Sequence, residues 1–376
     1  MTLLSADAVV TPDSVLRPGW VRIQGDRIVG VGAGVPDEPV DVALGDAVLA
    51  PGFVDVHCHG GGGSSFGTDV VGSTDAAATH LAHGTTSLLA SLVTGSAERM
   101  RDEVAALADL VVDGILDGIH LEGPWLAVSQ CGAHDPALLR PPVPAEVDAL
   151  AGHPAVRMVT IAPELPGALD AVRRVSGHGA VAAIGHTDAD LATARAAVAA
   201  GARHATHLFN AMRPLRHRDP GAVLALLEDP AVSLELIRDG VHLDPDLCTW
   251  LDSTVAPDRL VAVTDAMAAA GAADGDYRLG SLDVDVVEGV ARVRGTGAIA
   301  GSTATADVLF RSAAGAADDD GLVRAARQTA ANPARALGLE DRGWLAAGAR
   351  ADVVVLDPDG LVVRRVMRSG AWVTTR

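Results

Sequence analysis

The chain has 376 residues and a formal net charge of −19, because 48 acidic side chains outnumber 29 basic ones, all of them arginine. The lack of lysine excludes a Walker-type phosphate loop, a Schiff-base lysine and a carboxylated lysine that bridges two metal ions. The acidic balance argues against nucleic acid or an anionic membrane as the main partner. The first residues lack the basic start and long apolar stretch of a signal peptide, so we expect a cytoplasmic protein.

Residues 1–50 alternate short β-type runs with turn residues. The runs VRIQ and RIVGV are joined by Gly25 and Asp26, a two-residue turn that is typical of a β-hairpin.

From residue 51 onward, short apolar runs alternate with Ala-rich stretches of helical period, which is the pattern of βα units. Eight such runs lie within residues 51–265: GFVDVH, TTSLLASL, GIHLEG, VRMVTIAPE, VAAIGH, ARHATHLF, VSLELIRDG and LVAVTDA. Stretches such as AERMRDEVAALADLVVDG and DADLATARAAVAAG supply the helices between them. Eight buried strands in about 215 residues predict an α/β fold, a (β/α)8 TIM-like barrel.

The last helices are expected in STATADVLFRSAAGA and GLVRAARQTAANPARALG, and the tail then returns to β-type runs such as ADVVVLDPDG and LVVRRVMRSG. Since both ends of the chain have this texture, we predict a second, small β-sandwich domain formed by residues 1–50 plus 345–376. The catalytic barrel would then occupy residues 51–344.

Side chains that can bind a metal ion fall at or just after the C-terminal ends of the predicted strands, where barrel active sites are built. They are His57, His59, Glu122, His186, His207 and Asp265. Four imidazoles and two carboxylates suit zinc or a similar divalent ion. Such an ion activates water for hydrolysis of an amide or a similar C–N bond, with Asp265 placed to act as general base and then acid. Because the chain has no lysine, Glu122 is the candidate for a bridge between two ions.

Several segments together resemble the amidohydrolase superfamily, and within it the N-acetylglucosamine-6-phosphate deacetylase family. They are PGFVDVHCHG, HLEGPWL, GAHDP, IGHTDA, ATHLFNAM, DGVHLD, VTDAM and AGSTATA. They occur in the family's order and cover almost the whole chain. The resemblance implies hydrolysis of the acetamide of N-acetylglucosamine 6-phosphate to glucosamine 6-phosphate and acetate. It also implies one or two divalent ions per subunit, zinc first, with iron, cobalt and manganese as alternatives.

The resemblance also implies roles for single residues. Glu122, His186 and His207 match the principal metal ligands of the family. His57 and His59 match the pair that holds a second ion in members that keep both histidines. Asp265, as a ligand and as the general acid and base, completes this set.

Other matches concern the substrate. His134 matches the residue that polarises the acetyl carbonyl and helps to hold the oxyanion. Asn210 and Ala211 match the segment that cradles the sugar phosphate, and His242 matches a histidine that contacts phosphate or sugar. Arg218 matches an arginine that reaches the phosphate in the neighbouring subunit, which implies a homodimer.

The residues alone leave several alternatives open. The basic cluster Arg213, Arg216, His217 and Arg218 is either a solvated loop or a phosphate contact. The chain could also be another amidohydrolase, such as a D-amino-acid deacylase or a cyclic-amide or nucleobase hydrolase, or a barrel that has lost catalysis and serves as a scaffold.

The remaining histidines and cysteines carry weaker expectations. His120, two residues before Glu122, is a candidate to support the metal site. Cys131 is either a tolerated surface substitution or a mobile thiol beside the active site. We assign no role to the histidines expected on helices or loops, which are His80, His83, His153, His178 and His204. Cys58 and Cys248 are expected to pack as small apolar residues.

Overall fold

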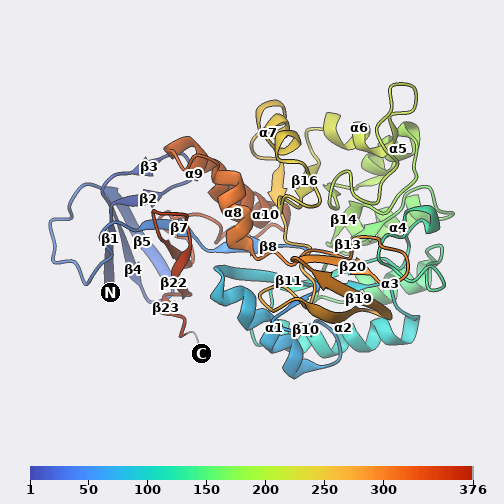
Figure 1. Ribbon diagram of the computed structural model, residues 1–376, viewed down its shortest axis with the longest axis horizontal. Helices are drawn as coiled ribbons and strands as arrows, with labels where there is room; N and C mark the ends of the chain where they lie inside the picture. Colours follow the sequence, from blue (N-terminus) through green and yellow to red (C-terminus); the bar gives the residue numbers. More distant parts are fainter. Residues whose placement is uncertain (375–376) are drawn as a thin grey trace. The chain divides into compact units, whose positions relative to one another are not determined.

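The structure of the protein is a computed structural model that describes residues 1–374 (Figure 1). The chain divides into two compact units. The barrel unit comprises Val56–Ala77 and Leu88–Ala304, and the terminal unit comprises Met1–Asp55, Ala78–Ser87 and Thr305–Arg376. The domain boundaries at residues 50 and 345 stay a prediction. No helix among the described residues is long and apolar enough to cross a membrane.

The eight strands expected from the sequence form one eight-stranded sheet, in which neighbours along the chain are neighbours in the sheet. Its strands are β8 (Phe53–Asp55), β11 (Thr85–Val93), β12 (Gly118–Glu122), β13 (Val156–Ile161), β14 (Val181–Ile184), β15 (His204–Ala205), β16 (Ser233–Leu236) and β17 (Leu260–Ala262). The pairs from β11 to β17 are parallel. A parallel bridge between Cys58 and Ala266 joins the segment after β8 to the segment after β17. The predicted barrel is therefore confirmed.

Helices follow the strands as the alternating pattern predicts, and α3 to α7 flank the strands in Figure 1. They are α1 (Val70–Ala82), α2 (Ala97–Val112), α3 (Pro144–Ala151), α4 (Ala168–Gly177), α5 (Leu191–Ala200), α6 (Gly221–Glu228) and α7 (Pro245–Thr254). In α2, Ser96 caps the first turn by accepting from the backbone N–H of Arg99. Met100, Val104 and Leu107, three and four residues apart, are buried in the core of the unit, which explains the helix.

A three-stranded antiparallel sheet follows β17, and the sequence analysis did not predict it. It consists of β18 (Gly275–Leu279), β19 (Leu282–Val287) and β20 (Val290–Val293). Its inward residues, such as Leu279 and Val284, form a small core with Met267 and Ala300. This sheet brings residues 275–301 beside the strand ends that carry the predicted site.

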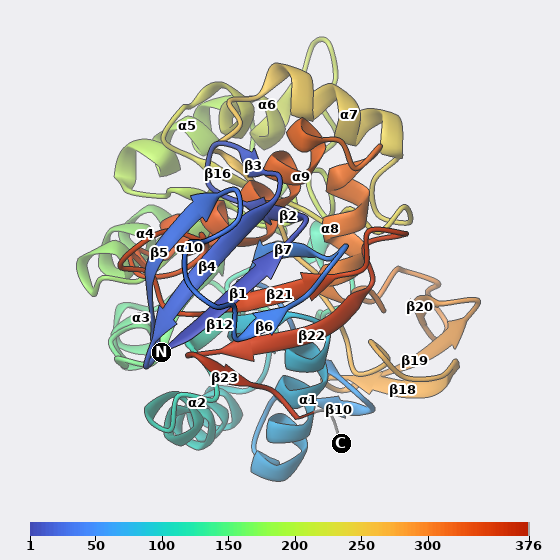
Figure 2. The ribbon, with the colours of Figure 1, turned by 90° about the vertical axis from the view of Figure 1, so that its left-hand side faces the viewer.

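The terminal unit contains two further sheets. One has the order β5-β4-β1-β6, and the other has the order β23-β22-β21-β7-β2-β3. The strands are β1 (Thr2–Ala6), β2 (Ala8–Val10), β3 (Val15–Leu16), β4 (Gly19–Gln24), β5 (Arg27–Ala33), β6 (Val42–Ala43), β7 (Val48–Pro51), β21 (Val353–Leu356), β22 (Val363–Arg368) and β23 (Ala371–Trp372). Figure 2 shows the N-terminal strands (blue) and the C-terminal strands β21 and β22 (red) within this unit. The expected hairpin joins β4 to β5, with Gly25 at φ +61° in its turn.

Alternating side chains of β21 serve both faces of their sheet. Val353 and Val355 lie in an apolar core with Leu4 and Val21 of the first sheet, so the two sheets pack as a sandwich. Val354 lies on the opposite face, in a second core that also contains residues of α8 (Ala306–Ala314) and α9 (Asp319–Ala326). A π-helical turn, Arg327–Ala331, leads from α9 to α10 (Asn332–Ala336).

Asp307, at the start of α8, is a buried carboxylate that should make the stability of the protein sensitive to acid. Burial would raise its pKa, but bonds from His83, Thr305 and Arg311 hold the pKa well below its ordinary value. Since the folded-state pKa is depressed, the stabilisation is fully present above the unfolded pKa of about 3.9, declines below it, and is lost only as pH falls through the folded-state pKa. We expect Asp307→Asn to lower the free energy of unfolding by about 1.5–3 kcal/mol at pH 7. Urea unfolding at pH 7, 5 and 3 would test this: the difference between variant and parent should be the same at pH 7 and 5 and should begin to shrink below about pH 3.9, and a difference that grows at pH 3 would contradict the prediction.

Candidate active site

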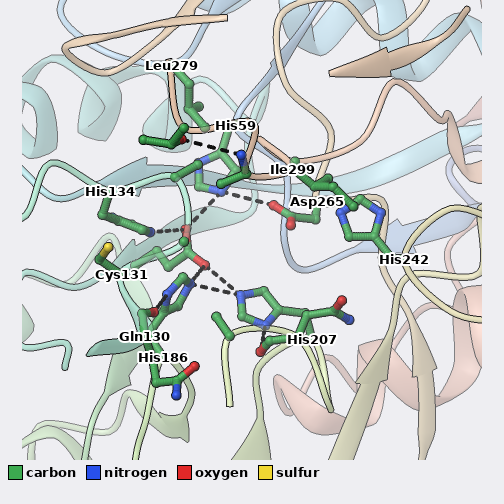
Figure 3. A pocket seen from close by; sticks show the side chains of 18 of the residues that line it. His59, Gln130, Cys131, His134, His186, His207, His242, Asp265, Leu279 and Ile299 are labelled. Carbon is green, nitrogen blue, oxygen red and sulfur yellow. Dashed lines mark hydrogen bonds and ion pairs between the residues drawn. The ribbon is translucent and has the colours of Figure 1, made fainter. Parts of the chain in front are cut away.

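The six predicted donors come together at the C-terminal ends of the barrel strands (Figure 3). Glu122 is the last residue of β12, and His186, His207 and Asp265 lie two or three residues beyond β14, β15 and β17. All six side chains are buried. The strands therefore supply a rigid frame for a polar cluster that is closed to bulk water on most sides.

The backbone is strained where three of these side chains leave their strands. His186, His207 and Asp265 have positive φ values of 47°, 29° and 46°. Residues other than glycine rarely adopt this region, and each such residue costs of order 1–3 kcal/mol. The surrounding structure holds all three in that conformation, which is typical of functional sites.

Glu122, His186 and His207 form one tight group. Glu122 Oε1 lies 3.0 Å from Nε2 of His186 and 3.0 Å from Nε2 of His207, and these two nitrogens are 3.0 Å apart.

His57, His59 and Asp265 form a second group. The Nε2 atoms of the two histidines are 3.1 Å apart, and Asp265 Oδ1 lies 3.2 Å from Nε2 of His59 and 3.4 Å from Nε2 of His57. Glu122 also faces this group, since its Oε2 is 3.2 Å from Nε2 of His59. The carboxylate of Glu122 therefore lies between both groups, where a bridging ligand would be.

The hydrogen bonds of the imidazoles settle which nitrogen faces the centre. His59, His186 and His207 each place Nδ1 against a backbone carbonyl, at 3.1, 2.8 and 3.1 Å, those of Ser91, Gln130 and Asn210. A carbonyl only accepts, so Nδ1 carries a proton and Nε2 is the nitrogen that can present a lone pair to a metal ion at the centre.

This donor set fits a divalent metal ion. Lone pairs that face one another at 3.0–3.1 Å repel unless a positive charge lies between them. Two nitrogens bound to one tetrahedral zinc ion, each about 2.0 Å from it, are separated by about 3.3 Å. Imidazole and carboxylate donors are those that zinc and similar ions prefer. The residues therefore fit such an ion both in chemistry and in spacing.

The electrostatics agree with this interpretation. Without a metal ion, burial would lower the pKa of His59, but its bonds with Asp265 and Glu122 raise the pKa to about 9, so the carboxylates draw a proton to the place where a metal ion would be bound. Burial would likewise raise the pKa of Asp265, but the charge of His57 and the bond with His59 lower it to about 2. Both carboxylates are ionised, since the pKa of Glu122 is also held well below its ordinary value despite burial, by His57, His134 and His186. The cluster attracts positive charge.

His134 lies beside the cluster, with Nε2 3.1 Å from Glu122 Oε2. Its Nδ1 accepts from the backbone N–H of Thr94 at 3.3 Å, so the proton is on Nε2. An imidazole with Nε2–H facing the pocket is a hydrogen-bond donor. This is the state that the predicted role of His134 toward a carbonyl oxygen requires.

A pocket with a volume of about 490 Å³ opens from the cluster. It is lined by His59, Glu122, His134, His186, His207, Asn210, Ala211, His242 and Asp265 among the predicted site residues. Leu279, Thr296, Ala298 and Ile299, from the sheet β18 to β20 and the segment after it, add a wall that the sequence analysis missed. Figure 3 shows Leu279 and Ile299 on the side of His59 and Asp265. Alternating apolar residues in LDVDVV were the available signal for these strands.

Of the residues predicted to bind the sugar phosphate, some line the pocket and one, Arg218, does not. His242 lines the pocket and places Nδ1 2.7 Å from Asp239 Oδ2, which fixes its ring. Arg218 is exposed on the loop of residues 213–219 and is not among the pocket residues of its own chain. Arg213, from the same basic cluster, forms ion pairs with Asp188 and with Asp219.

Two histidines and a cysteine were given weak or no roles. His120 is buried between Ser91 and Thr160, at 2.9 and 2.8 Å, and its ring packs edge-on against His57 with centroids 4.5 Å apart. The expectation that His204 lies on a helix or loop is wrong, because it is the first residue of β15. Cys131 lines the pocket as a free cysteine of intermediate exposure, and its two interpretations stay open.

The backbone of Asp265 leaves no room for a side chain at Gly301. A Cβ atom there would lie 2.6 Å from the carbonyl oxygen of Asp265, and Gly301 has φ +65°. We expect Gly301→Ala to displace Asp265 and to slow catalysis by about 10²-fold, the effect of a misplacement near 1 Å. Gly297→Ala is the matched control, since Gly297 has φ +74° but no atom within 4 Å of its Cβ position. Equal activity of the two variants in steady-state assays would contradict the prediction.

The comparisons with known proteins agree with this geometry. Residues 48–373 match the profile of the Amidohydrolase family. The chain therefore belongs to the amidohydrolase family.

Within this family, the relatives of the chain are named as deacetylases of amino-sugar phosphates. It is 37% identical to an N-acetylglucosamine-6-phosphate deacetylase of Bos taurus, over 99% of this chain and 93% of that protein. It is 36% identical to an N-acetylgalactosamine-6-phosphate deacetylase of Escherichia coli O157:H7, over 94% and 95%. The solved structure of a Mycobacterium smegmatis N-acetyl-D-glucosamine-6-phosphate deacetylase mutant, in complex with N-acetyl-D-glucosamine-6-phosphate, is 53% identical. That structure matches with a TM-score of 0.95 over 100% of this chain and 99% of the other.

Proposed function

We propose that the chain is a metal-dependent hydrolase that converts N-acetylglucosamine 6-phosphate to glucosamine 6-phosphate and acetate. The observation that carries this proposal is the convergence of four Nε2 atoms and two carboxylates at the base of the pocket, beside a histidine that donates from Nε2. The identities of the relatives support the substrate.

Zinc is the proposed ion, with iron, cobalt or manganese as alternatives. Glu122, His186 and His207 would hold one ion, and His57, His59 and Asp265 would hold a second where two are present. When bound, such an ion lowers the pKa of a water molecule and polarises a carbonyl group.

Asp265 is the proposed general base and acid. It is ionised at neutral pH, because, despite burial, His57 and His59 hold its pKa below the ordinary value, and an ionised carboxylate beside the bound water can accept a proton. It lies at the pocket surface, where the amide nitrogen of the substrate can then receive that proton. Protonation lets the amine leave as glucosamine 6-phosphate while the acetyl carbon keeps the oxygen from water.

His134 is the proposed donor to the acetyl oxygen. Its Nε2–H faces Glu122 in this structure, at the pocket surface. Because negative charge develops on the carbonyl oxygen during attack, a fixed donor stabilises the transition state more than the substrate.

Asn210, Ala211 and His242 are the proposed contacts to the sugar and phosphate. Since Arg218 lies outside the pocket of its own chain, we also propose a homodimer in which Arg218 reaches the neighbouring active site. A guanidinium binds phosphate oxygens in bidentate fashion. We place the enzyme in the cytoplasm, because a charged sugar phosphate does not cross a bilayer unaided.

The homodimer proposal predicts complementation between two defective variants. Arg218→Ala should raise KM for the phosphorylated substrate with little change in kcat, because the contact to phosphate is equally strong in the ground state and in the transition state. Asp265→Asn should be nearly inactive. If the two are unfolded and refolded together, mixed dimers contain one intact site, so kcat/KM per chain should exceed the average of the two separate variants. No gain over that average would contradict the shared site.

Release of acetate tests the proposed function. The purified protein, stripped with a chelator and reloaded with zinc, is offered N-acetylglucosamine with and without the 6-phosphate. We expect acetate only with zinc, and a strong preference for the phosphorylated sugar. Equal rates on both sugars, or full activity after stripping, would contradict the proposal.

N-acetylgalactosamine 6-phosphate is a second candidate substrate. It differs only in the configuration of one hydroxyl group, and a relative that is 36% identical over most of the chain is named for it. Parallel measurement of kcat/KM for the two epimers decides between them.

A further inference from the structure

Glu235 is a buried carboxylate beside the cluster of candidate metal ligands, and no sequence motif singles it out. It lies in β16, and its side chain is fully buried. Three donors point at it. Its Oε2 lies 3.0 Å from Nδ1 of His57 and 2.9 Å from the backbone N–H of His207, and its Oε1 lies 2.9 Å from Nε2 of His204.

Glu235 determines which nitrogen of His57 faces the cluster. An ionised carboxylate only accepts, so Nδ1 of His57 carries a proton and Nε2 is the nitrogen left to bind a metal ion. The other three cluster histidines use a backbone carbonyl for this purpose, whereas His57 uses a charged side chain. If the ring of His57 changed tautomer, an N–H group would point at His59 and Asp265 and would block a metal ion.

The same carboxylate also acts on the other group of donors. By accepting from the backbone N–H of His207, Glu235 holds the residue whose φ is +29°, at the point where β15 ends. His204 holds the second oxygen, so the carboxylate is bound at both of its atoms. The ring of His57 is also held by its edge-on contact with the ring of His120.

We propose that Glu235 is a positioning residue that organises both donor groups at once: it keeps His57 in the Nδ1–H tautomer and holds the backbone of His207. This inference rests on the proposed function only in taking His57 and His207 as metal ligands. It predicts that changes at Glu235 weaken metal binding itself, and not only the stability of the barrel.

The test uses Zn²⁺ as the only probe. Glu235→Met keeps the length of the side chain but removes the carboxylate, and Glu103→Met is the matched control. Glu103 is another buried carboxylate of the same unit, bonded to Arg99 on α2 and to none of the cluster histidines among the bonds described. For each variant, competition with a chromophoric chelator gives the number and dissociation constants of bound zinc ions. The visible absorption of the Co²⁺ form reports the ligand geometry.

We expect Glu235→Met to bind zinc about 10- to 100-fold more weakly, which is the effect of losing a partner that orients a metal ligand. Its Co²⁺ spectrum should change, and Glu103→Met should match the parent in both measurements. A folded Glu235→Met protein with zinc constants within twofold of the parent would overturn the proposal.

Glu235→Gln covers the case in which the methionine variant does not fold. Glutamine keeps the shape and one acceptor oxygen, but it loses the charge that strengthens the bond to His57. We expect a smaller loss of zinc affinity and, with saturating zinc, a lower kcat at unchanged KM. Unchanged zinc affinity and an unchanged Co²⁺ spectrum would again overturn the proposal. Failure of the proposed function is a separate result, because the parent would then bind no zinc or release no acetate.

Discussion

Replacement of Asp265 by asparagine should give a folded protein that keeps the zinc ion of the Glu122, His186 and His207 group and loses nearly all turnover. The amide cannot accept the proton from water or return it to the amine, and general acid–base catalysis contributes about 10²- to 10⁴-fold. Zinc should stay bound because Glu122, His186 and His207 form a donor group of their own. Zinc content and single-turnover rates of acetate release measure the two effects separately.

Two outcomes would contradict this assignment. A variant that keeps more than about a tenth of the parental rate would exclude Asp265 as the main proton carrier. A variant that loses its zinc in proportion to its activity would show that Asp265 acts as a ligand alone. The pH profile of any residual activity adds a check, since it should no longer report an acidic group.

Replacement of Glu122 by glutamine should have the second large effect, and it should act through the metal. Both oxygens of Glu122 face imidazole nitrogens, those of His186 and His207 on one side and of His59 on the other. Loss of its charge weakens both donor groups, so we expect zinc affinity to fall by at least about 100-fold, more than for a residue that only orients a ligand. Metal analysis after dialysis, followed by assay at increasing zinc, measures the loss.

The contrast with Asp265→Asn makes this prediction specific. Added zinc should restore part of the activity of Glu122→Gln but none of the activity of Asp265→Asn. A Glu122→Gln protein with parental zinc content after dialysis would contradict the position of Glu122 between the two groups.

The barrel and the location of its site were predictable because both follow from local patterns. Each apolar run is a strand, and the rule that barrel sites lie at the C-terminal strand ends placed His57, Glu122 and His207 together across large sequence separations. The histidine tautomers were not predictable. They depend on carbonyl groups such as those of Ser91 and Gln130, which any residue type would supply.

Glu235 and the wall of the pocket were missed for different reasons. Glu235 lies within an apolar run, VSLELIRDG, without a second donor at a metal-binding spacing; the neighbouring strand β15 brings it to His204, and only closure of the barrel brings it to His57. The strands β18 to β20 interrupt the βα alternation, so the pattern did not predict where their apolar residues would lie. The proposed reach of Arg218 depends on a second copy of the chain, which no pattern within one chain places.

The left-handed backbone at His186, His207 and Asp265 also bears on how this enzyme can be engineered. Glycine at any of these positions would relieve the local strain, and glycine is the residue that such conformations favour. A library screened for heat resistance alone would therefore be drawn toward these sites, and each gain there would remove a donor and yield an inert protein. Stabilising changes are better sought in the terminal unit, and every round of selection needs acetate release as a second criterion.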